Sequence, residues 1–291
     1  MSQVIVNAIV SAAGYLLVGL GFALIYSTTR FFHFAHGIVV TAGAYVAFAL
    51  TAWLGLPLWT AMFGGIIASA LLGGIIELSV YRPLRTRAAS AGILLLASLG
   101  AYVALQAVIV IAFGSGTQTL RAGNVPEALP ILGARITIPQ IATIVVSSVC
   151  CLFVWLLLTR TQIGKMLRAV ACDHDLAQVC GIRGESVIMA AFLLGSSLAG
   201  LAGVLLALDG DMTPAMGFQL LLMGMLAVIV GGIDSIPGAA LGAVLLGLTQ
   251  NLSAWWLSSK WEDAIVFAIL ILFLLLRPQG FLGKPLGKVT V

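Results

Sequence analysis

Two histidines three positions apart form the pair whose residue type and spacing most readily suggest chemistry. His33 and His36 lie in the run "HFAHG", and Gly37 follows directly. An i, i+3 spacing puts both rings on one face of a helix. A zinc site would need further ligands, and no carboxylate or cysteine lies near them in the sequence. Three interpretations of the pair are open: polar rings that are hydrogen-bonded at a helix end, a gate at the mouth of a path, and a metal site. We predict that the protein binds no metal and no cofactor.

Catalytic constellations are missing from the sequence. It holds no HEXXH motif, no paired carboxylates and no Ser/Lys pair within an apolar run. No apolar run carries a charge near its midpoint, whereas proton- or sodium-coupled transporters usually bury one. We therefore predict that the protein is not an enzyme but a passive membrane path, whose energy source lies outside this chain. The cysteines have no metal-ligand spacing either; they are Cys150, Cys151, Cys172 and Cys180.

The elements that would position these residues are apolar helices. Hydrophobic residues make up 61% of the 291-residue chain and charged residues 8%, and the mean hydropathy is +1.16. Several runs reach the ~18 to 25 residues that a helix needs to cross a bilayer, and they lack the alternation of barrel strands. The predicted fold class is all-α, a polytopic helical membrane protein with about eight to ten transmembrane helices. The candidate segments are 4–28, 33–53, 58–80, 91–113, 138–158, 186–208, 217–233, 237–257 and 261–277.

Two places leave the number of spans open. Segment 33–53 begins with the two histidines, and segments 217–233 and 237–257 are separated only by the turn "GGIDSIPG". A broken or re-entrant helix in either place would change the count. The first run, 4–28, lacks a basic start and a cleavage site, so we expect it to be retained as a helix. We expect one transmembrane domain over 1–291.

Basic residues are distributed unevenly between the links. Eleven of the fourteen lie on one side of the predicted spans, which the positive-inside bias makes cytoplasmic. This puts the N-terminus and loop 114–137 outside and the C-terminus inside. The net charge of +4 needs no nucleic-acid partner, because inner-face loops are basic anyway. The eleven are Arg30, Arg82, Arg85, Arg87, Arg160, Lys165, Arg168, Arg183, Arg277, Lys284 and Lys288; the opposite links hold Arg121, Arg135 and Lys260 together with Glu127, Asp209, Asp211, Glu262 and Asp263.

Small and polar residues within the apolar runs favour close helix packing. Glycine lets two helices approach, and an uncharged polar group in lipid seeks a partner on a neighbouring helix. We also expect Glu77, four residues before Tyr81, to pair with Arg82 or Arg85. The packing glycines are Gly64, Gly65, Gly73, Gly74, Gly195, Gly200, Gly203, Gly238 and Gly242, and the polar groups are Asn7, Gln106, Gln250 and Asn251.

A charged segment that still has a helical pattern, "IGKMLRAVACDHDLAQVCGIR", interrupts the apolar chain at 163–183. It begins with an apolar stripe, which predicts an amphipathic helix continuing from the fifth span. Asp173 fits an N-cap, Asp175 suits the first turn of a helix, and Gly181 fits a C-terminal stop. They enclose a second helix of about seven residues. The stripe is Ile163, Met166, Leu167 and Val170.

So short a helix is marginal alone in water and normally packs against something. On the cytoplasmic face of a transporter that has no energy-coupling residues of its own, an ATPase is one such partner. A solvated loop with incidental capping residues is the alternative interpretation.

Several motifs together resemble the branched-chain amino-acid permeases of the LivH type. The run "DLAQVCG" at 175–181 is similar to the EAA-x3-G loop by which ABC importer permeases dock their ATPases. The resemblance covers about residues 5 to 283 in order. The other motifs that carry it are "T-x-I-G-K-M-L-R-A-V-A-C-D", "FFHFAHGIVVTAGAYVAF", "LGSSLAGLAGVLLAL", "LAVIVGGIDSIPGAALGAVLLG" and "LLLRPQGFLG".

The resemblance implies a fold and a set of partners. The fold would be that of the type II (vitamin B12 importer-like) ABC permeases, in a bacterial inner membrane. The partners would be a LivM-like second permease, two LivG/LivF-like ABC ATPases and a periplasmic substrate-binding protein. Within the cytoplasmic loop 159–185, the segment Asp173 to Gly181 would be the coupling helix; the coupling residues would be Arg168, Asp173, Asp175, Leu176, Ala177 and Gly181.

Pairing of two permeases would place the translocation path at their interface. Helix breaks near His33 to Gly37 and near Gly231 to Gly238 are candidates to line it. Asp234 and Gln250 depart from the pattern of this family, which leaves open whether the substrate is a hydrophobic amino acid or a similar small carboxylate or amide. The path and gate residues are thus His33, His36, Gly37, Gly231, Gly232 and Pro237.

The function predicted is that of a permease subunit of an ATP-driven importer. The alternative is a secondary transporter or channel that acts without ATPases. Uptake by this chain alone, driven by a gradient, would distinguish the two.

Overall fold

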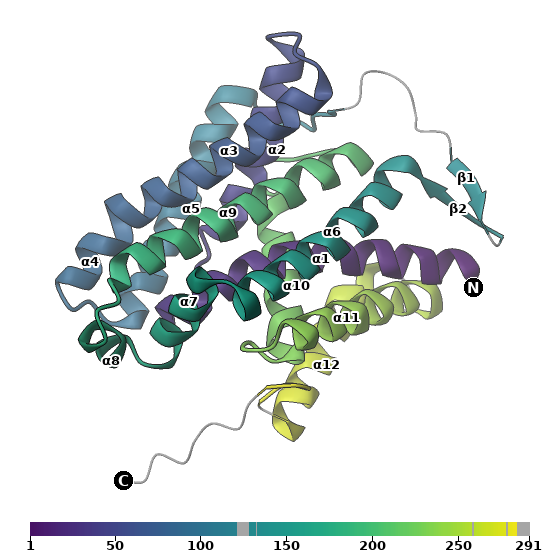
Figure 1. Ribbon diagram of the computed structural model, residues 1–291. Helices are drawn as coiled ribbons and strands as arrows, with labels where there is room; N and C mark the ends of the chain where they lie inside the picture. Colours follow the sequence, from purple (N-terminus) through teal and green to yellow (C-terminus); the bar gives the residue numbers. More distant parts are fainter. Residues whose placement is uncertain (121–127, 132, 258, 278, 284–291) are drawn as a thin grey trace.

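The computed structural model describes residues 1–120, 128–131, 133–257, 259–277 and 279–283. Within these ranges the chain is a bundle of helices with one small hairpin (Figure 1). Arg121, Glu127, Lys284 and Lys288, four of the charges used for the orientation, lie outside the described residues.

A helix occupies each of the predicted apolar segments. The long elements are α1 (Ser2–Thr29), α2 (His36–Ala52), α3 (Leu58–Ile76), α5 (Ala91–Phe113), α6 (Ile138–Arg160), α9 (Gly184–Asp209), α10 (Met216–Gly231), α11 (Ile236–Trp256) and α12 (Glu262–Leu276). The short ones are the π-helical turn η1 (Glu77–Tyr81), α4 (Arg82–Thr86), α7 (Gln162–Cys172), α8 (His174–Val179) and the 3₁₀ turn η2 (Ser259–Trp261). Strands β1 (Ala128–Ile131) and β2 (Ala134–Thr137) pair antiparallel.

Six helices in the described ranges are long and apolar enough to cross a membrane. They are α1, α3 with its continuation to Thr86, α5, α6, α9 and α11. Helices α2 and α10 are shorter, and they fall in two of the segments where the sequence left the count open. At 1.5 Å per residue they reach only about 25 Å, short of the ~30 Å hydrocarbon core. Most of their residues are buried in the protein, so they need not match the bilayer.

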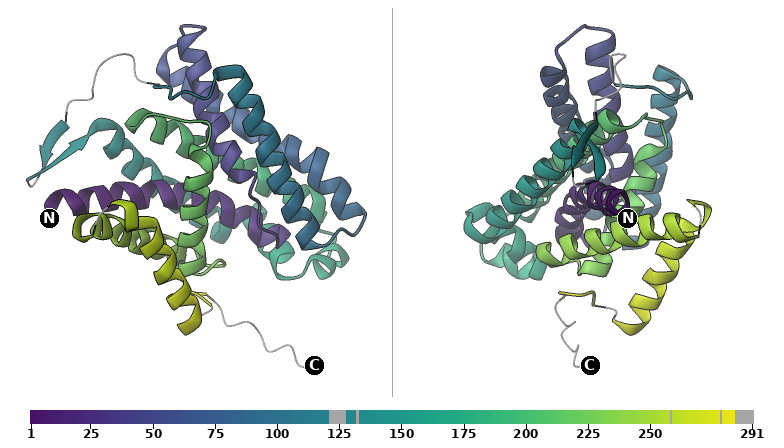
Figure 2. Two further views of the ribbon diagram at one scale, coloured as in Figure 1. Left: turned by 180° about the vertical axis from the view of Figure 1, so that it is seen from behind. Right: turned by 90° about the vertical axis from the view of Figure 1, so that its right-hand side faces the viewer.

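Helix α1 runs through the middle of the molecule (Figures 1 and 2). It packs against α6, α9, α10 and α11, and α9 in turn packs against α2 and α3. The ends of α4, α7 and α8 gather at one end of the bundle, and the N-terminus and the β1–β2 hairpin lie at the other (Figure 1). The charged segment therefore sits at the end of the spans opposite to the N-terminus.

The predicted close packing through glycine is confirmed. A side chain at Gly203 of α9 would clash with the backbone of Val40 in α2. One at Gly242 of α11 would clash with the carbonyl of Ala227 in α10. These contacts bring helix backbones together where no larger residue fits.

Polar groups at membrane depth connect helices in two of the predicted cases. The Tyr15 hydroxyl of α1 hydrogen-bonds Gln250 of α11, and the Asn251 amide donates to the Ser11 hydroxyl over 3.3 Å. Asn7 instead accepts a hydrogen bond from Gln3 of its own helix, 2.9 Å away, so the interhelical role predicted for it is wrong. Residues four apart share a helix face, and the long Gln3 side chain reaches Asn7 first. Gln106 is half-buried on α5.

Two elements were not predicted from the sequence. The third span continues through the π turn η1 into α4, and part of loop 114–137 forms the β1–β2 hairpin. Thr137 ends this hairpin and begins α6 with a capping box, in which its side chain accepts from the backbone N–H of Gln140. The hairpin is thus fixed directly to the start of a membrane-spanning helix.

Candidate functional site

The charged segment folds into two helices separated from α6. The prediction of an amphipathic helix at its start is confirmed by α7, but α7 does not continue from the fifth span. Thr161 is extended, and its hydroxyl accepts a hydrogen bond from the N–H of Gly164 over 3.0 Å. Gly164 lies so close to the backbone of Leu157 and Leu158 that a side chain there would clash. A capped break therefore turns α7 away from α6.

The apolar face of α7 anchors the segment to the bundle. Leu167 and Val170 are buried in a cluster with Val187 and Ala191 of α9. Ile163, the first member of the predicted stripe, is instead 47% exposed. It lies in the first turn next to the break, beyond the part of α7 that α9 covers.

Helix α8 has the caps that the sequence predicted. Asp173 Oδ1 accepts a hydrogen bond from the N–H of Leu176 over 2.9 Å, and Asp175 lies in the first turn. Gly181 has φ +85°, and its N–H reaches the carbonyl of Gln178 over 2.9 Å. The N–H of Ile182 bonds the carbonyl of Ala177 over 3.0 Å, which completes a Schellman motif. Six residues thus form a helix with both ends satisfied.

The exposed side of α8 carries two apolar side chains beside the polar Asp175 and Gln178. Ala177 faces inward and is buried in the same cluster as Leu167. Leu176 and Val179 point away from the bundle, with 61% and 83% of their surface exposed. At three residues apart they share one face of the helix. A rigidly capped helix therefore presents two apolar side chains at the end of the bundle.

A buried ion pair supports the neighbouring end of the third span. Glu77 is 1% exposed and pairs with Arg85, whose guanidinium also lies 3.1 Å from a carboxylate oxygen of Glu185 at the start of α9. Arg82 lies 3.3 Å from the same carboxylate. Of the two predicted partners of Glu77, Arg85 is the one observed. The network connects η1 and α4 to the start of α9.

The histidine pair lies inside the protein. His33 and His36 are both fully buried, and His33 Nδ1 is 2.8 Å from the Tyr81 hydroxyl. Their rings contact each other, and His33 also contacts Phe192 of α9. No group of three possible metal ligands occurs in the described ranges.

The glycines proposed for the path lie at backbone contacts between helices. Gly37 packs on Gly217 of α10, and Gly231 packs on Gly238 across the turn between α10 and α11. Gly232 has φ +108°, which a side chain rarely adopts. Pro237 is exposed in the first turn of α11.

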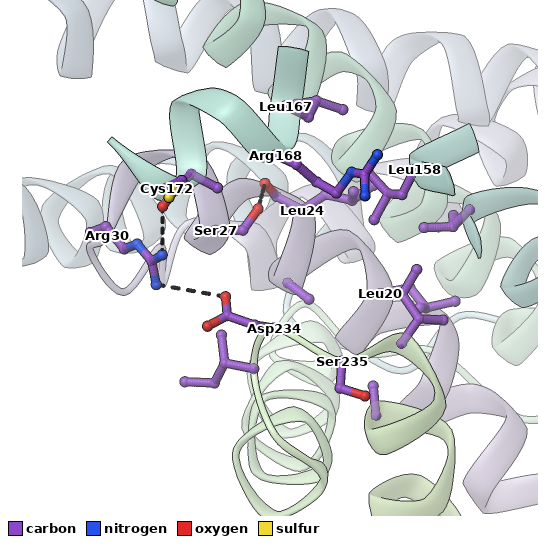
Figure 3. A pocket seen from close by; sticks show the side chains of 16 residues that line it. Leu20, Leu24, Ser27, Arg30, Leu158, Leu167, Arg168, Cys172, Asp234 and Ser235 are labelled. Carbon is purple, nitrogen blue, oxygen red and sulfur yellow. Dashed lines mark hydrogen bonds and ion pairs between the residues drawn. The ribbon is translucent and has the colours of Figure 1, made fainter. Parts of the chain in front are cut away.

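A cavity of about 570 Å³ opens beside this turn (Figure 3). It lies between the end of α1, α6, α7 and residues 233–236 at the start of α11. We call it the Arg30 cavity. Its charged lining residues are Arg30, Arg168 and Asp234, so Arg168 lies here and not on α8. His33, His36, Gly231, Gly232 and Pro237 are not among its lining residues; the full lining is Leu20, Ala23, Leu24, Ser27, Arg30, Val154, Leu158, Leu167, Arg168, Ala171, Cys172, Ile233, Asp234, Ser235, Ile236 and Ala239.

The sequence did not single out Arg30 and Asp234 as a pair. Arg30 Nη1 lies 3.7 Å from Asp234 Oδ1, although the two residues are far apart in the chain. Each is a charge placed directly after an apolar run, which was the available signal, but only the packing of α1 on α11 brings them together.

Comparison with known proteins identifies the family. Residues 4–274 match the family model for the permease component of the branched-chain amino acid transport system. The chain belongs to this family. It is 34% identical to the high-affinity branched-chain amino acid transport system permease protein BraD of Pseudomonas aeruginosa, over 97% of this chain and 96% of the relative. It is 32% identical to LivH of Escherichia coli over the same shares, and 31% identical to the probable LivH of Methanocaldococcus jannaschii, over 99% and 94%.

A solved structure confirms the fold class of this permease. The structure of PsaBC from Streptococcus pneumoniae in complex with Fab superposes with a TM-score of 0.54, covering 96% of this chain and 92% of that chain. At 14% identity the likeness concerns the fold alone. The predicted all-α, polytopic helical membrane fold is confirmed. The family makes the chain a transport subunit and not an enzyme.

Proposed function

We propose that this permease is the membrane subunit of an ATP-driven importer for branched-chain and other hydrophobic amino acids. Its relatives are named as permeases of branched-chain amino acid transport systems. The chain works in a bacterial inner membrane, with its C-terminus in the cytoplasm. A periplasmic binding protein delivers the amino acid, two ABC ATPases of the LivG/LivF kind drive transport, and a LivM-like permease completes the path.

The observation that carries the ATPase coupling is the exposed apolar face of α8. Leu176 and Val179 are exposed on a helix that both caps hold rigid. Neighbouring apolar side chains exposed on one face outside the bilayer favour a surface that another protein covers. Ala177 fixes α8 to α7 and α9, so a force on α8 is transmitted to a membrane-spanning helix. Helix α8 is therefore the coupling helix, with Asp173, Asp175 and Gly181 as its shape-determining residues.

The path lies where the two permeases meet. Helices α6 and α11 border the Arg30 cavity and expose apolar side chains such as Val149 and Leu241. Motion of α7, which follows α6, alters the wall of the cavity. His33, His36, Gly37, Gly231, Gly232 and Pro237 act as the hinge and gate positions of the helix ends beside that path.

The test replaces the exposed face of α8. The double variant Leu176→Asp, Val179→Asp should release the ATPases from the purified importer and abolish coupled ATP hydrolysis, because charges replace the docking side chains. The stability of the permease itself should be unchanged, since both side chains are exposed. Leu54→Asp, a similarly exposed position in the connection between α2 and α3, is the matched control and should keep the ATPases.

Two outcomes would contradict the proposal. ATPases that remain bound and coupled in the α8 double variant would show that α8 is not the coupling helix. Uptake by this permease alone, without ATPases, would favour a secondary transporter or channel.

A further inference from the structure

The Arg30 cavity combines two kinds of lining. One end carries the Arg30–Asp234 pair, and Arg168 lies across the cavity from it (Figure 3). The remaining wall is mainly apolar, with branched aliphatic side chains such as Leu20, Leu24, Val154, Leu158 and Ile236, and it also holds the small polar residues Ser27, Cys172 and Ser235. Its volume of about 570 Å³ falls in the ordinary range of small-molecule pockets.

Arg30 is held in place at the charged end. It caps the C-terminus of α1 with φ +55°, a conformation uncommon for a residue other than glycine or asparagine. Arg30 Nη2 donates to the carbonyl of Ala171 at the end of α7, 2.7 Å away. The guanidinium is therefore oriented before any ligand arrives, and Nη1 faces Asp234.

The ion pair between Arg30 and Asp234 is loose. The separation of 3.7 Å between Nη1 and Oδ1 exceeds the length of a hydrogen bond. Both side chains are about half exposed, and such pairs contribute little to stability. A ligand that carries both charges can enter this pair without disrupting the fold.

The mixture of charges favours a zwitterion over an anionic lipid headgroup. Basic pockets at the cytoplasmic side of a membrane protein commonly bind phosphate headgroups. Here, however, Asp234 stands beside Arg30, and a phosphate would be repelled by the carboxylate. An α-amino acid matches both groups: its carboxylate suits Arg30, its ammonium suits Asp234, and a branched aliphatic side chain suits the wall.

We infer that the Arg30 cavity binds the transported amino acid on the inner part of its path, and that Asp234 selects for the ammonium group. The inference rests on the proposed function and narrows its substrate class to zwitterionic amino acids with aliphatic side chains. It excludes urea, simple amides and carboxylic acids without an ammonium group, because these ligands bring no cation to Asp234.

The cavity contains its own reporter. Cys172 lines it, whereas Cys180 lies outside it, at the C-terminus of α8, and both are exposed. In the assembled importer without nucleotide, in nanodiscs, leucine should slow the reaction of Cys172 with a maleimide and leave the rate at Cys180 unchanged. Modification is followed by mass spectrometry of the two peptides. Ser27→Cys places a second reporter on α1 in the same cavity. This second reporter is used if a bound ATPase shields Cys172 from the maleimide.

Variants test the two charges separately. Arg30→Gln should weaken protection by leucine about tenfold or more, because the carboxylate loses its charged partner. Asp234→Asn should remove selectivity, so that 4-methylpentanoate protects as well as leucine does. In the unaltered permease that acid should protect about tenfold less than leucine. Lys165→Gln, an exposed residue of α7 outside the cavity lining, is the matched control and should behave like the parent.

Three results would overturn the inference. The first is a rate of Cys172 modification that leucine does not change. The second is equal protection of Cys172 by leucine and 4-methylpentanoate in the unaltered permease. The third is protection that rises with the content of anionic lipid in the nanodisc. ATP-driven leucine uptake, measured with the same preparation in liposomes, separates this inference from the proposed function. ATP-driven uptake without protection of the cysteine reporters refutes only the assignment of the Arg30 cavity as the binding site. Absence of ATP-driven uptake refutes the proposed function.

Discussion

At the scale of single residues, Glu77 is the buried charge on which the end of the third span depends. It pairs with Arg85, eight positions along the chain. In a regular α-helix residues eight apart lie on different parts of the surface. The π turn Glu77–Tyr81 inserts one extra residue, so Arg85 takes the place of an i+7 residue and faces Glu77.

Removing the arginine should therefore destabilise the permease strongly. Arg85→Met leaves the Glu77 carboxylate buried without its partner, which costs about 3–5 kcal/mol. The double variant Glu77→Met, Arg85→Met should recover most of that loss, because no charge remains uncompensated. Thermal unfolding in detergent measures both.

Glu185→Gln is the control for this prediction. Its carboxylate is about two-fifths exposed, so the expected cost is about 1 kcal/mol or less. If the Arg85→Met variant unfolds at the same temperature as the parent protein, the Glu77–Arg85 pair does not stabilise the fold.

At the residue scale, the sequence predicted helix caps correctly but did not settle which charged side chains pair with one another. Glu77 was expected to pair with Arg82 or Arg85, and only the π turn decided between them. Asp173 and Gly181 were predicted correctly because caps depend on local backbone geometry. Arg30 and Asp234 come together through tertiary packing, which residue spacing does not encode.

At the scale of elements, α8 owes its shape to its two ends. Six residues make too few hydrogen bonds to hold a helix alone, so the Asp173 cap and the left-handed Gly181 stabilise it. The sequence identified both ends. The break at Thr161 was missed, because the apolar stripe begins only two residues later and no glycine or proline stands at the break itself.

Changing Gly181 tests the C-terminal stop. Gly181→Val should cost about 1–2 kcal/mol at this site, since valine resists φ +85°, and should reduce coupled ATP hydrolysis by misplacing α8. Gly181→Asn should retain hydrolysis, because asparagine tolerates the left-handed conformation. Space around the position is open, so only backbone strain is tested. Equal hydrolysis in the two variants would contradict the prediction.

The contact of α9 with α2 gives a second prediction for elements. Gly203→Ala should destabilise the fold by about 1–3 kcal/mol, because its methyl group would meet the carbonyl of Val40. Gly100→Ala on α5, where nothing lies within 4 Å of the added methyl group, should leave stability unchanged or raise it by up to about 1 kcal/mol. Melting temperatures of the two variants provide the measurement. A Gly203→Ala variant as stable as the parent would refute the tight contact.

At the scale of the whole molecule, the proposed function assigns one end of the bundle to the ATPases and the opposite end to the binding protein. Helices α4, α7 and α8 gather at one end, and the hairpin and N-terminus lie at the other (Figure 1). The apolar pattern predicted the helices of this bundle, including the short α2 and α10. It could not predict the cavity, whose walls come from segments more than two hundred residues apart.

The orientation of this arrangement is a prediction that native cysteines can test. A membrane-impermeant maleimide should label Cys172 and Cys180 in inverted vesicles and not in intact cells, because both lie at the end assigned to the cytoplasm. Leu129→Cys, in the hairpin at the opposite end, should show the reverse pattern. Labelling of Cys180 from outside intact cells would invert the proposed topology.

ATP-driven uptake tests the central claim most directly. The permease is reconstituted into liposomes with its second permease and both ATPases, the binding protein is added outside, and radiolabelled leucine uptake is followed. Leucine should accumulate only when ATP is inside and every subunit is present, and the α8 variant Leu176→Asp, Val179→Asp should abolish accumulation. Leucine entry through this permease alone, without ATPases or ATP, would contradict the account.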